Sequence, residues 1–338
     1  MTKSSETKII LFLIILLFFT SCKNQNKKIS FSGEAQGGFY NITYYDKQGR
    51  NFQKAVDSIL DEINHTASMY EPSSILSKIN KGDTNVNLND DFIAIYNLAT
   101  EISKKTGGAF DITVGPLVNV WGFGLKNRTR VDSAMIDSLL KYVGYEMTGI
   151  KNNKFYKKYP EIQIDFNAIA QGYSVDKISL FFESKGINNY IVEIGGEVRA
   201  AGKKPDGSSW IVGIDKPDDN LGAAHDLKAK VTLDNMSVST SGNYRKFYIE
   251  NGIKYSHTIN PFTGYPVNHS LLSASVFHKN CATADAYATA FMVMGVEKAK
   301  EFLKKSDERI QVYLIYSDKD GKMQTYMSDG LKNILKEN

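Results

Sequence analysis

An apolar segment, residues 284–295, carries two oxygen-bearing side chains, Asp285 and Thr289. If the segment is a helix, their spacing places them one turn apart on the same face. In one interpretation, Thr283 caps the helix and Asp285 is a first-turn acid that faces the helix dipole. In the other, Asp285 and Thr289 are oxygen ligands of a hard cation. The segment by itself leaves both interpretations open.

Five further segments combine glycine with hydroxyl, acidic, amide or aromatic side chains. They are residues 68–80, 106–124, 164–178, 191–214 and 239–267. Taken singly, each has a structural explanation: Gly195 and Gly196 can form a tight strand exit, and His257 can be a core histidine. Taken together, they predict a ligand site. Its glycines would let the backbone come close to the ligand. Its hydroxyls and an acid would contact phosphate and metal, and its aromatic residues would pack on a ring.

Hydrophobic periodicity predicts the elements that must position these segments. Helical spacing predicts helices over residues 52–63, 92–102, 132–142 and 296–305, with stops at Gly107, Gly108 and Gly144. Apolar and β-branched runs predict strands over residues 39–46, 190–194, 210–214, 271–277 and 310–316. Strands and helices interleave without a regular βαβ rhythm. This predicts a mixed-sheet α+β fold in one compact body of one or two lobes.

Composition argues against a nucleic-acid-binding protein, and the motifs argue against Rossmann and Walker A nucleotide-binding proteins. The 41 basic and 37 acidic residues give a net charge of +4, which is too balanced for a nucleic-acid partner. Residues 121–126, WGFGLK, hold two glycines but lack the third glycine of a Rossmann fingerprint and the acid that follows it. The sequence also has no Walker A loop.

The N-terminus has the features of an export signal. Lys3 and Lys8 flank an eleven-residue apolar run, which is shorter than the ~20 residues that a membrane span needs. Small residues before Cys22 resemble the lipobox of bacterial lipoproteins. That resemblance implies removal of residues 1–21, a diacylated Cys22, a polar tether over residues 22–30 and a globular domain over residues 31–338. The protein would then be lipid-anchored in a bacterial cell envelope, facing the periplasm or the exterior. A plain secretory signal is the alternative.

The chain contains only two cysteines, Cys22 and Cys281. If Cys22 carries lipid, Cys281 has no partner and the fold must hold without a disulfide. Cys281 precedes the apolar helix, and no His–Asn pair is suggested near it. We therefore expect a buried structural thiol rather than a nucleophile.

The five glycine-rich segments, followed by ADAYAT at residues 284–289, resemble in order the motifs of the ApbE family of flavin transferases. The likeness extends from about residue 37 to about residue 316. It implies that family's fold and a Mg²⁺-dependent reaction on FAD. In that reaction FMN is joined through a phosphoester bond to a Thr or Ser hydroxyl of a target protein, and AMP is released. Targets of the family include subunits of redox pumps and exported reductases.

The resemblance also implies roles for individual residues. FAD contacts are implied for Tyr70, Ala109, Phe110, Asp111, Gln171, Lys177 and the backbone of Ile259. Metal ligands are implied at the side chains of Asp285 and Thr289 and at the backbone carbonyls of Ser174 and Ala288. His257, within SHTI, is the implied general base.

Three positions depart from the family pattern. Gln36 begins QGGF where the family often has MGTF, whose methionine contacts FAD. Asn260 stands where an aspartate commonly follows the histidine motif. Ala288 stands where some members have a second acid, and one fewer carboxylate is expected to weaken metal binding unless the backbone carbonyl serves.

Two alternatives would use the same residues. With water as the nucleophile, the site would hydrolyse FAD to FMN and AMP. Without turnover, the chain would be a flavin-binding lipoprotein, although binding alone needs no metal that activates phosphate. The sequence discriminates poorly between a hydroxyl and water, and Tyr70 with the apolar helix favours a closed site and therefore transfer.

Overall fold

The computed structural model describes residues 26–125, 131–217, 226–243, 247–250 and 253–338. The expected signal peptide and Cys22 lie outside these residues, so lipidation stays a prediction. Within the described ranges, no helix combines the length and the apolar character that crossing a bilayer requires.

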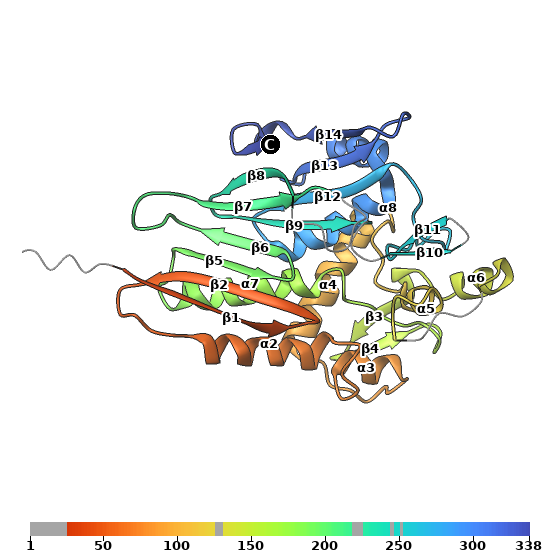
Figure 1. The fold of residues 1–338 in the computed structure, drawn as a ribbon. Helices are drawn as coiled ribbons and strands as arrows, with labels where there is room; N and C mark the ends of the chain where they lie inside the picture. The colour runs from red at the N-terminus through yellow and green to blue at the C-terminus, as the bar shows by residue number, and fades with distance from the viewer. Residues whose placement is uncertain (1–25, 126–130, 218–225, 244–246, 251–252) are drawn as a thin grey trace, which may run out of the picture.

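An eight-stranded antiparallel sheet forms the centre of the fold, in the order β1-β2-β5-β6-β9-β12-β13-β14 (Figure 1). Its strands are β1 (Lys27–Ala35), β2 (Gly38–Asp46), β5 (Tyr190–Ile194), β6 (Glu197–Ala201), β9 (Met236–Gly242), β12 (Leu271–His278), β13 (Gln311–Ser317) and β14 (Met323–Met327). In β2, Tyr40, Ile42 and Tyr44 are buried and alternate with more exposed residues, as the period of two in a strand requires.

Smaller sheets and the helices complete the molecule. The small sheets are formed by β7 (Trp210–Asp215), β8 (Leu227–Leu233) and β15 (Leu335–Glu337), by β3 (Thr148–Lys151) and β4 (Lys154–Lys157), and by β10 (Phe247–Glu250) and β11 (Ile253–Ser256). The α-helices are α2 (Gln53–Ala67), α3 (Ile75–Asn80), α4 (Asp90–Lys105), α5 (Gly115–Val120), α6 (Ser133–Leu140), α7 (Ala170–Ser184) and α8 (Cys281–Lys305). Two short 3₁₀ turns are η1 (Tyr145–Met147) and η2 (Asp329–Leu331).

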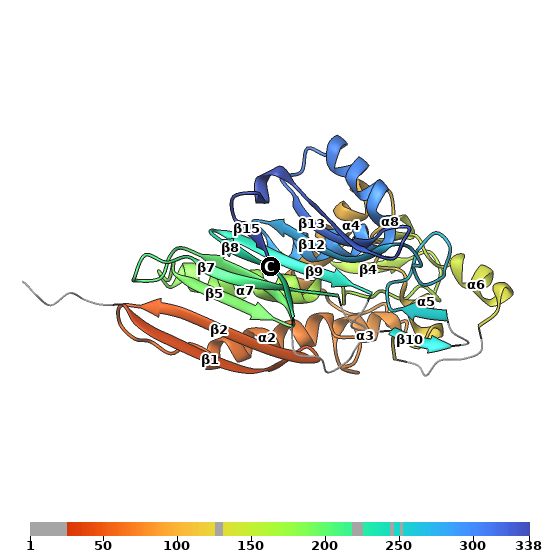
Figure 2. The same cartoon turned by 45° about the horizontal axis from the view of Figure 1, so that its top comes forward.

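The central sheet is covered on both faces. On one face, Ala274 and Val276 of β12 belong to the core cluster that contains α8 and α4. On the other face, Phe277 of β12 and Tyr313 of β13 pack with β7 and β8. Figure 2 shows α2 (orange) beside β1 and β2, and α8 (blue) beside β12 and β13. Because α8 is buried against both the sheet and α4, it needs an apolar surface on nearly every side.

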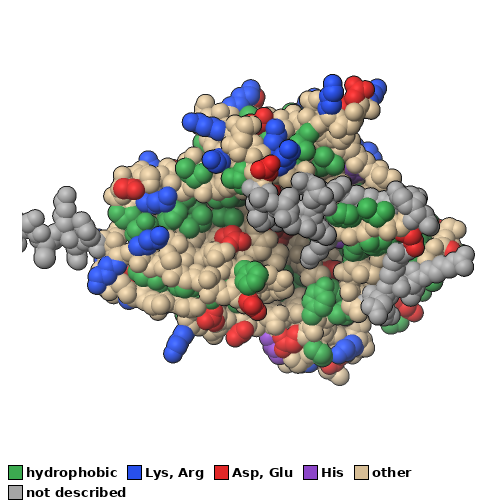
Figure 3. All heavy atoms as spheres, viewed as in Figure 1, with side chains coloured by type: hydrophobic (Ala, Val, Ile, Leu, Met, Phe, Trp, Pro, Cys, Tyr) green, Lys and Arg blue, Asp and Glu red, His purple; other side chains and the backbone are tan. Residues whose placement is uncertain are grey.

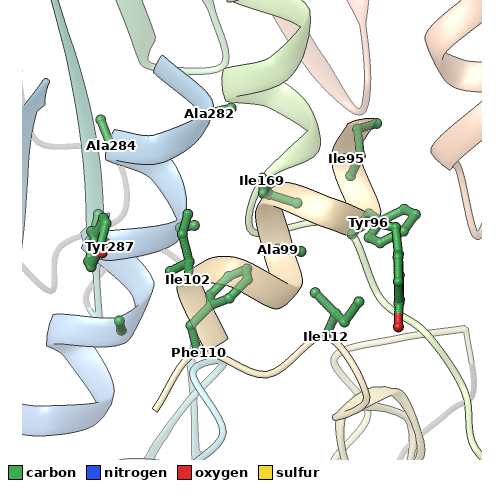
Figure 4. Packing of buried hydrophobic residues seen from close by; sticks show 14 of the residues in the cluster. Ile95, Tyr96, Ala99, Ile102, Phe110, Ile112, Ile169, Ala282, Ala284 and Tyr287 are labelled. Carbon is green, nitrogen blue, oxygen red and sulfur yellow. The ribbon is translucent and has the colours of Figure 1, made fainter. Parts of the chain in front are cut away.

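Close packing between α4 and α8 fixes the position of the buried helix. Figure 4 shows Ala99 and Ile102 of α4 beside α8, and they share one core cluster with Tyr287 of α8. These residues are between 0% and 2% exposed, so they exclude water from this interface.

The predicted mixed α+β fold is confirmed, and so are most of the predicted elements. The expected strands correspond to β2, β5, β7, β12 and β13, and the expected helices to α2, α4, α6 and the last part of α8. The prediction of a tether up to residue 30 was wrong at its end. Strand β1 begins at Lys27, which pairs with Asp46 of β2. Strand β1 lies at the edge of the sheet and pairs only with β2, so many of its side chains face solvent and are polar. Polar side chains of this kind are also typical of a tether.

Candidate functional site

Asp285 lies inside α8, with its carboxylate held between α7 and β9. The Gly172 amide of α7 donates to Oδ2 at 3.2 Å, and the Ser239 hydroxyl of β9 lies 3.5 Å from Oδ1. The side chain is 5% exposed. Burial raises the pKa of this carboxyl to about 7, against the opposing effect of the two hydrogen bonds. A buried carboxylate without a cation at the site is therefore costly to ionise, and a bound cation would stabilise the charge.

Thr289 lies one helical turn beyond Asp285 and faces the same strand. Its Oγ1 is 3.2 Å from the hydroxyl of Ser241 in β9. The helix period of about four and the strand period of two bring two matched pairs together, Ser239 with Asp285 and Ser241 with Thr289. The two oxygens proposed from spacing do share a face.

The capping interpretation of this segment is wrong. Helix α8 begins at Cys281, with Asn280 rather than Thr283 at its N-cap, so Asp285 lies beyond the first turn. The carboxylate of Asp176 in α7 accepts the hydrogen bonds of the first two amides, from Cys281 at 2.9 Å and Ala282 at 3.0 Å. The Asp176 carboxylate thus satisfies two amides at the start of α8 that have no partner within the helix. Asp285 is therefore not needed as a cap.

Two of the implied metal ligands are the carbonyls of Ser174 in α7 and Ala288 in α8, and both roles stay predictions. Both residues lie inside helices, where main-chain carbonyls accept hydrogen bonds from the following turn. The Ala168 carbonyl, just before α7, is a further candidate ligand. In a continuous helix Gly172 would donate to it, but Gly172 donates to Asp285. Within the described residues, no backbone hydrogen bond reaches the Ala168 carbonyl.

The donor set at this position suits magnesium. It combines one buried carboxylate at Asp285 with one hydroxyl at Thr289. These are hard oxygen donors, and so few of them leave coordination places for phosphate and water. Across the described part of the chain, no group of three or more His, Cys, Asp or Glu side chains could hold a metal.

The QGGF turn lies beside the first turn of α7. The Gln36 side-chain amide donates to the Ser174 hydroxyl at 2.6 Å, and Gln171 donates to the Gln36 carbonyl at 3.4 Å. Gln36 and Gly37 both have positive φ, of 52° and 76°, which closes the β1–β2 hairpin tightly. The turn that departs from the family pattern is thus adjacent to the glycine that supports Asp285.

Tyr70 is exposed, as a ligand-stacking residue should be. It is 58% exposed and follows a turn in which the Ser68 hydroxyl accepts from the Tyr70 amide at 3.1 Å. Although the residue as a whole is exposed, neighbouring protein atoms partly desolvate its hydroxyl, and this desolvation together with the nearby Asp165 carboxylate raises the pKa of Tyr70. Asp165 was not singled out from the sequence, although its place three residues before Ala168 puts it beside the site.

The segment with Ala109, Phe110 and Asp111 is more deeply buried than a pocket lining requires. Phe110 is 3% exposed and packs in the main core, and Ala109 packs with Val267 and Val293. The Asp111 carboxylate accepts hydrogen bonds from the Thr113 amide (2.8 Å) and hydroxyl (2.6 Å) and from the Tyr145 amide (2.9 Å). These bonds organise the loop, and a contact of Asp111 with a nucleotide stays a prediction.

The histidine segment presents both a ring and a free backbone edge. His257 directly follows β11, and its ring lies edge-on to Phe123 at 6.4 Å between centroids. Ile259 forms an antiparallel bridge with Pro266, and the bonds that flank it join Val267 to Thr258 and Asn260 to Tyr265. In such a pair the amide and carbonyl of Ile259 point away from the hairpin, which suits the implied backbone contact.

Lys177 is engaged elsewhere. Its ammonium forms an ion pair with the buried carboxylate of Asp91 in α4, which also accepts from the Tyr173 hydroxyl at 2.7 Å. The same helix carries Gln171 and Gly172 on the faces that meet the hairpin and α8. The implied contact between Lys177 and FAD would require the lysine to leave Asp91, so it stays a prediction.

Cys281 is buried, as expected for a structural thiol. It is 0% exposed, and desolvation with the nearby carboxylates of Asp176, Glu197 and Asp285 raises its pKa well above the ordinary value. Hydrogen bonds place these carboxylates around the start of α8: Asp176 accepts from its first amides, and Asp285 and Glu197 both contact Ser239. Glu197 of β6 was not predicted as a site residue, because only the two glycines that precede it were considered.

Two cavities lie away from Asp285. One, of about 210 Å³, is bounded by β6, β7 and Thr240, which points to the opposite face of β9 from Ser239. The other, of about 610 Å³, is lined by Thr283 and Tyr287 on the opposite side of α8 from Asp285. Neither cavity is lined by Asp285 or Thr289, so a search for these cavities would not find the candidate metal site.

Comparison with known proteins accounts for this arrangement. The ApbE family model matches residues 37–314. The chain belongs to the ApbE family. The family's FAD:protein FMN transferase from Vibrio cholerae is 34% identical over 331 residues, covering 96% of this chain and 97% of that protein. The enzyme of the same name from Haemophilus influenzae is 33% identical over 326 residues, covering 92% and 93%.

Solved structures of the ApbE family share the fold. The flavin transferase ApbE from Vibrio cholerae superposes with a TM-score of 0.81 at 34% identity, covering 91% of this chain and 99% of that one. The apo flavinyl transferase ApbE from Pseudomonas stutzeri gives a TM-score of 0.82 at 30% identity, covering 92% and 97%. These likenesses bear out both the family resemblance and the α+β architecture.

Proposed function

We propose that this chain transfers FMN from FAD to a Thr or Ser hydroxyl of an exported protein, with Mg²⁺ as the required cation. The observation that carries the proposal is the pair of oxygens on one face of α8, Asp285 and Thr289, each facing a serine of β9. Membership of the ApbE family and the names of its relatives support flavin transfer. Magnesium, the hydroxyl acceptor and release of AMP are our additions.

Asp285 and Thr289 would hold the cation, with the Ala168 carbonyl as a further candidate ligand. When bound, Mg²⁺ would neutralise charge on the diphosphate of FAD and on the departing AMP. The carboxylate of Asp285 supplies the negative charge that attracts the cation, and burial keeps competing water away. The Gly172 amide and Ser239 keep this carboxylate from rotating.

His257 would serve as the general base. Its ring takes the proton of the target hydroxyl while that oxygen forms a bond to the FMN phosphorus, and the bond from this phosphorus to the AMP oxygen breaks. General-base assistance of this kind contributes about 100–10,000-fold to a rate. The position of His257 at the end of β11 gives its ring a rigid support on one side.

Aromatic and backbone groups would orient FAD. Tyr70 offers an exposed ring on which the flavin can stack. The outward-facing backbone of Ile259 can exchange hydrogen bonds with a polar edge of the ligand. Together they would hold FAD so that its diphosphate reaches Asp285.

The site of action follows from the N-terminus. We propose that Cys22 carries the lipid anchor and that the chain faces the periplasm or the exterior of a bacterial envelope. The target proteins would share that compartment, as redox-pump subunits and exported reductases do. On the face shown in Figure 3, acidic side chains (red) lie among basic ones (blue), which agrees with a protein target rather than a nucleic acid.

A transfer assay tests the proposal. The chain lacking residues 1–21 is incubated with FAD, Mg²⁺ and an exported flavoprotein, and covalent yellow fluorescence is followed on a denaturing gel. We expect labelled target and equimolar AMP with Mg²⁺, and neither with EDTA. Free FMN and AMP without labelled target would identify a hydrolase instead. Unchanged FAD in the presence of Mg²⁺ would leave only a flavin-binding protein and overturn the proposal.

A further inference from the structure

Strand β9 presents a row of serines to helix α8. Ser237, Ser239 and Ser241 lie on one face of the strand because they are two residues apart. Ser239 and Ser241 meet Asp285 and Thr289, whereas Ser237 lies 3.2 Å from the Lys279 carbonyl. The row therefore divides into two serines at the site and one outside it.

We propose that Ser241 and Ser239 are positioning residues of the cation site, each orienting one ligand. Ser241 sets the direction of the Thr289 hydroxyl, and Ser239 restrains the Asp285 carboxylate. This inference rests on the proposed Mg²⁺ site, and it adds to that site two groups that do not touch the cation.

The argument for Ser241 concerns a hydrogen. A threonine hydroxyl can bind a cation through an oxygen lone pair only if its own hydrogen points away toward an acceptor. Hydroxyls inside helices often use the carbonyl four residues earlier, as Thr66, Ser103 and Ser179 do here. Among the described hydrogen bonds, Thr289 makes none of that kind, and its partner is Ser241 at 3.2 Å. Either hydroxyl can donate at this distance; in the arrangement that we propose, Thr289 donates to Ser241, and a Thr289 lone pair is then turned toward the cation.

The argument for Ser239 concerns rotation of the carboxylate. Its hydroxyl lies 3.5 Å from Oδ1 of Asp285 and 3.3 Å from Oε1 of Glu197. A hydroxyl has one hydrogen, so it can donate to only one of these carboxylates at a time. With the Gly172 amide on Oδ2, Ser239 completes a contact to each oxygen of Asp285. When Ser239 donates to Asp285 rather than to Glu197, both oxygens of Asp285 are held before the cation arrives.

Cation affinity of the FAD-free protein tests this directly. Mg²⁺ binding is measured by titration calorimetry, and Mn²⁺ binding by electron paramagnetic resonance, for the parent, Ser241→Ala, Ser239→Ala and Ser241→Thr. Loss of a group that orients a ligand typically weakens metal affinity by about 10–100-fold, and we expect that loss for both alanine variants. Ser241→Thr keeps the hydroxyl and should stay near the parent value.

Ser237→Ala is the matched control, because it removes the same hydroxyl from the same face of the same strand. We expect its cation affinity to equal that of the parent. Parent-like affinity in Ser241→Ala, or an equal loss in Ser237→Ala, would overturn the positioning role. If Ser241→Ala does not fold, Ser241→Cys replaces it, since a thiol accepts hydrogen bonds weakly and must also lower affinity.

The outcome separates this inference from the function on which it rests. If the parent binds neither cation without FAD, the titrations are repeated with AMP and FMN present, which supply phosphate oxygens. Absence of binding there overturns the metal site itself. Binding by the parent that Ser241→Ala and Ser239→Ala retain in full overturns only the roles of the two serines.

Discussion

The amide nitrogen of Gly172 lies 3.2 Å from Oδ2 of Asp285, so a backbone group of α7 supports the buried carboxylate of α8. This approach is possible because residue 172 has no side chain. A Cβ at this position would lie 2.6 Å from the Cys281 carbonyl oxygen and 2.8 Å from Ala282. The glycine of the QGYS motif is therefore required by helix contact.

Gly172→Ala is accordingly expected to push α7 away from α8. Overpacking of this kind costs roughly 1–3 kcal/mol of unfolding free energy. Cation affinity should fall as well, because Asp285 loses its backbone donor. Urea unfolding and Mg²⁺ titration measure the two effects. Gly38→Ala is the control, since its Cβ would meet only an ordinary contact at 3.7 Å. Equal behaviour of the two variants would contradict the close approach.

Asp285→Asn keeps the shape of the side chain and removes its charge. We expect transfer to be lost at ordinary Mg²⁺ concentrations, while the metal-free fold is retained because burial of a charge is avoided. Thr289→Val removes only a neutral ligand and should raise the Mg²⁺ requirement by less. AMP release measured over a Mg²⁺ series distinguishes the two variants. A parent-like Mg²⁺ curve in Asp285→Asn would be incompatible with a ligand role.

His257→Ala should bind FAD but transfer FMN slowly. The loss of a general base predicts a fall in rate of about 100–10,000-fold, with FAD affinity close to that of the parent. Single-turnover labelling and flavin fluorescence titration measure the rate and the affinity. His278→Ala is the control, because His278 is the last residue of β12 and its ring hydrogen-bonds with the backbone of Asn280. Transfer at the parent rate would remove His257 from the mechanism.

Asp46 provides a stability prediction away from the site. Hydrogen bonds from the Arg50 side chain hold the pKa of its carboxyl at about 2, below the ordinary value of 3.8. Its ionised form therefore stabilises the fold above about pH 4, and this contribution is lost as the pH falls toward 2. Asp46→Asn should lower the urea midpoint more at pH 7 than at pH 3. As a control, Asp137→Asn at an exposed position should leave the urea midpoint unchanged at both pH values. If Asp46→Asn lowers the midpoint equally at pH 7 and pH 3, the ion pair with Arg50 is not the cause.

Periodicity in the sequence was enough to locate β2, β12, β13 and α4, but it did not find α7 and β9, the two elements whose residues contact Asp285 and Thr289. Alternation in β2 and helical spacing in α4 each record one buried face, which is a local property of the chain. The same reasoning found Asp285 and Thr289, because a helix of known period determines which residues share a face. It failed at residues 27–30, where strand β1 exists only through pairing with β2.

The tertiary structure decided which groups surround that pair. Whether Thr283 capped α8 depended on Asp176, a residue more than a hundred positions away that satisfies the first amides. Ser239, Ser241 and Glu197 join the site because β6 and β9 are neighbours in the sheet and α8 packs across them. Such contacts arise from the packing of whole elements, and a residue's spacing along the chain carries no record of them.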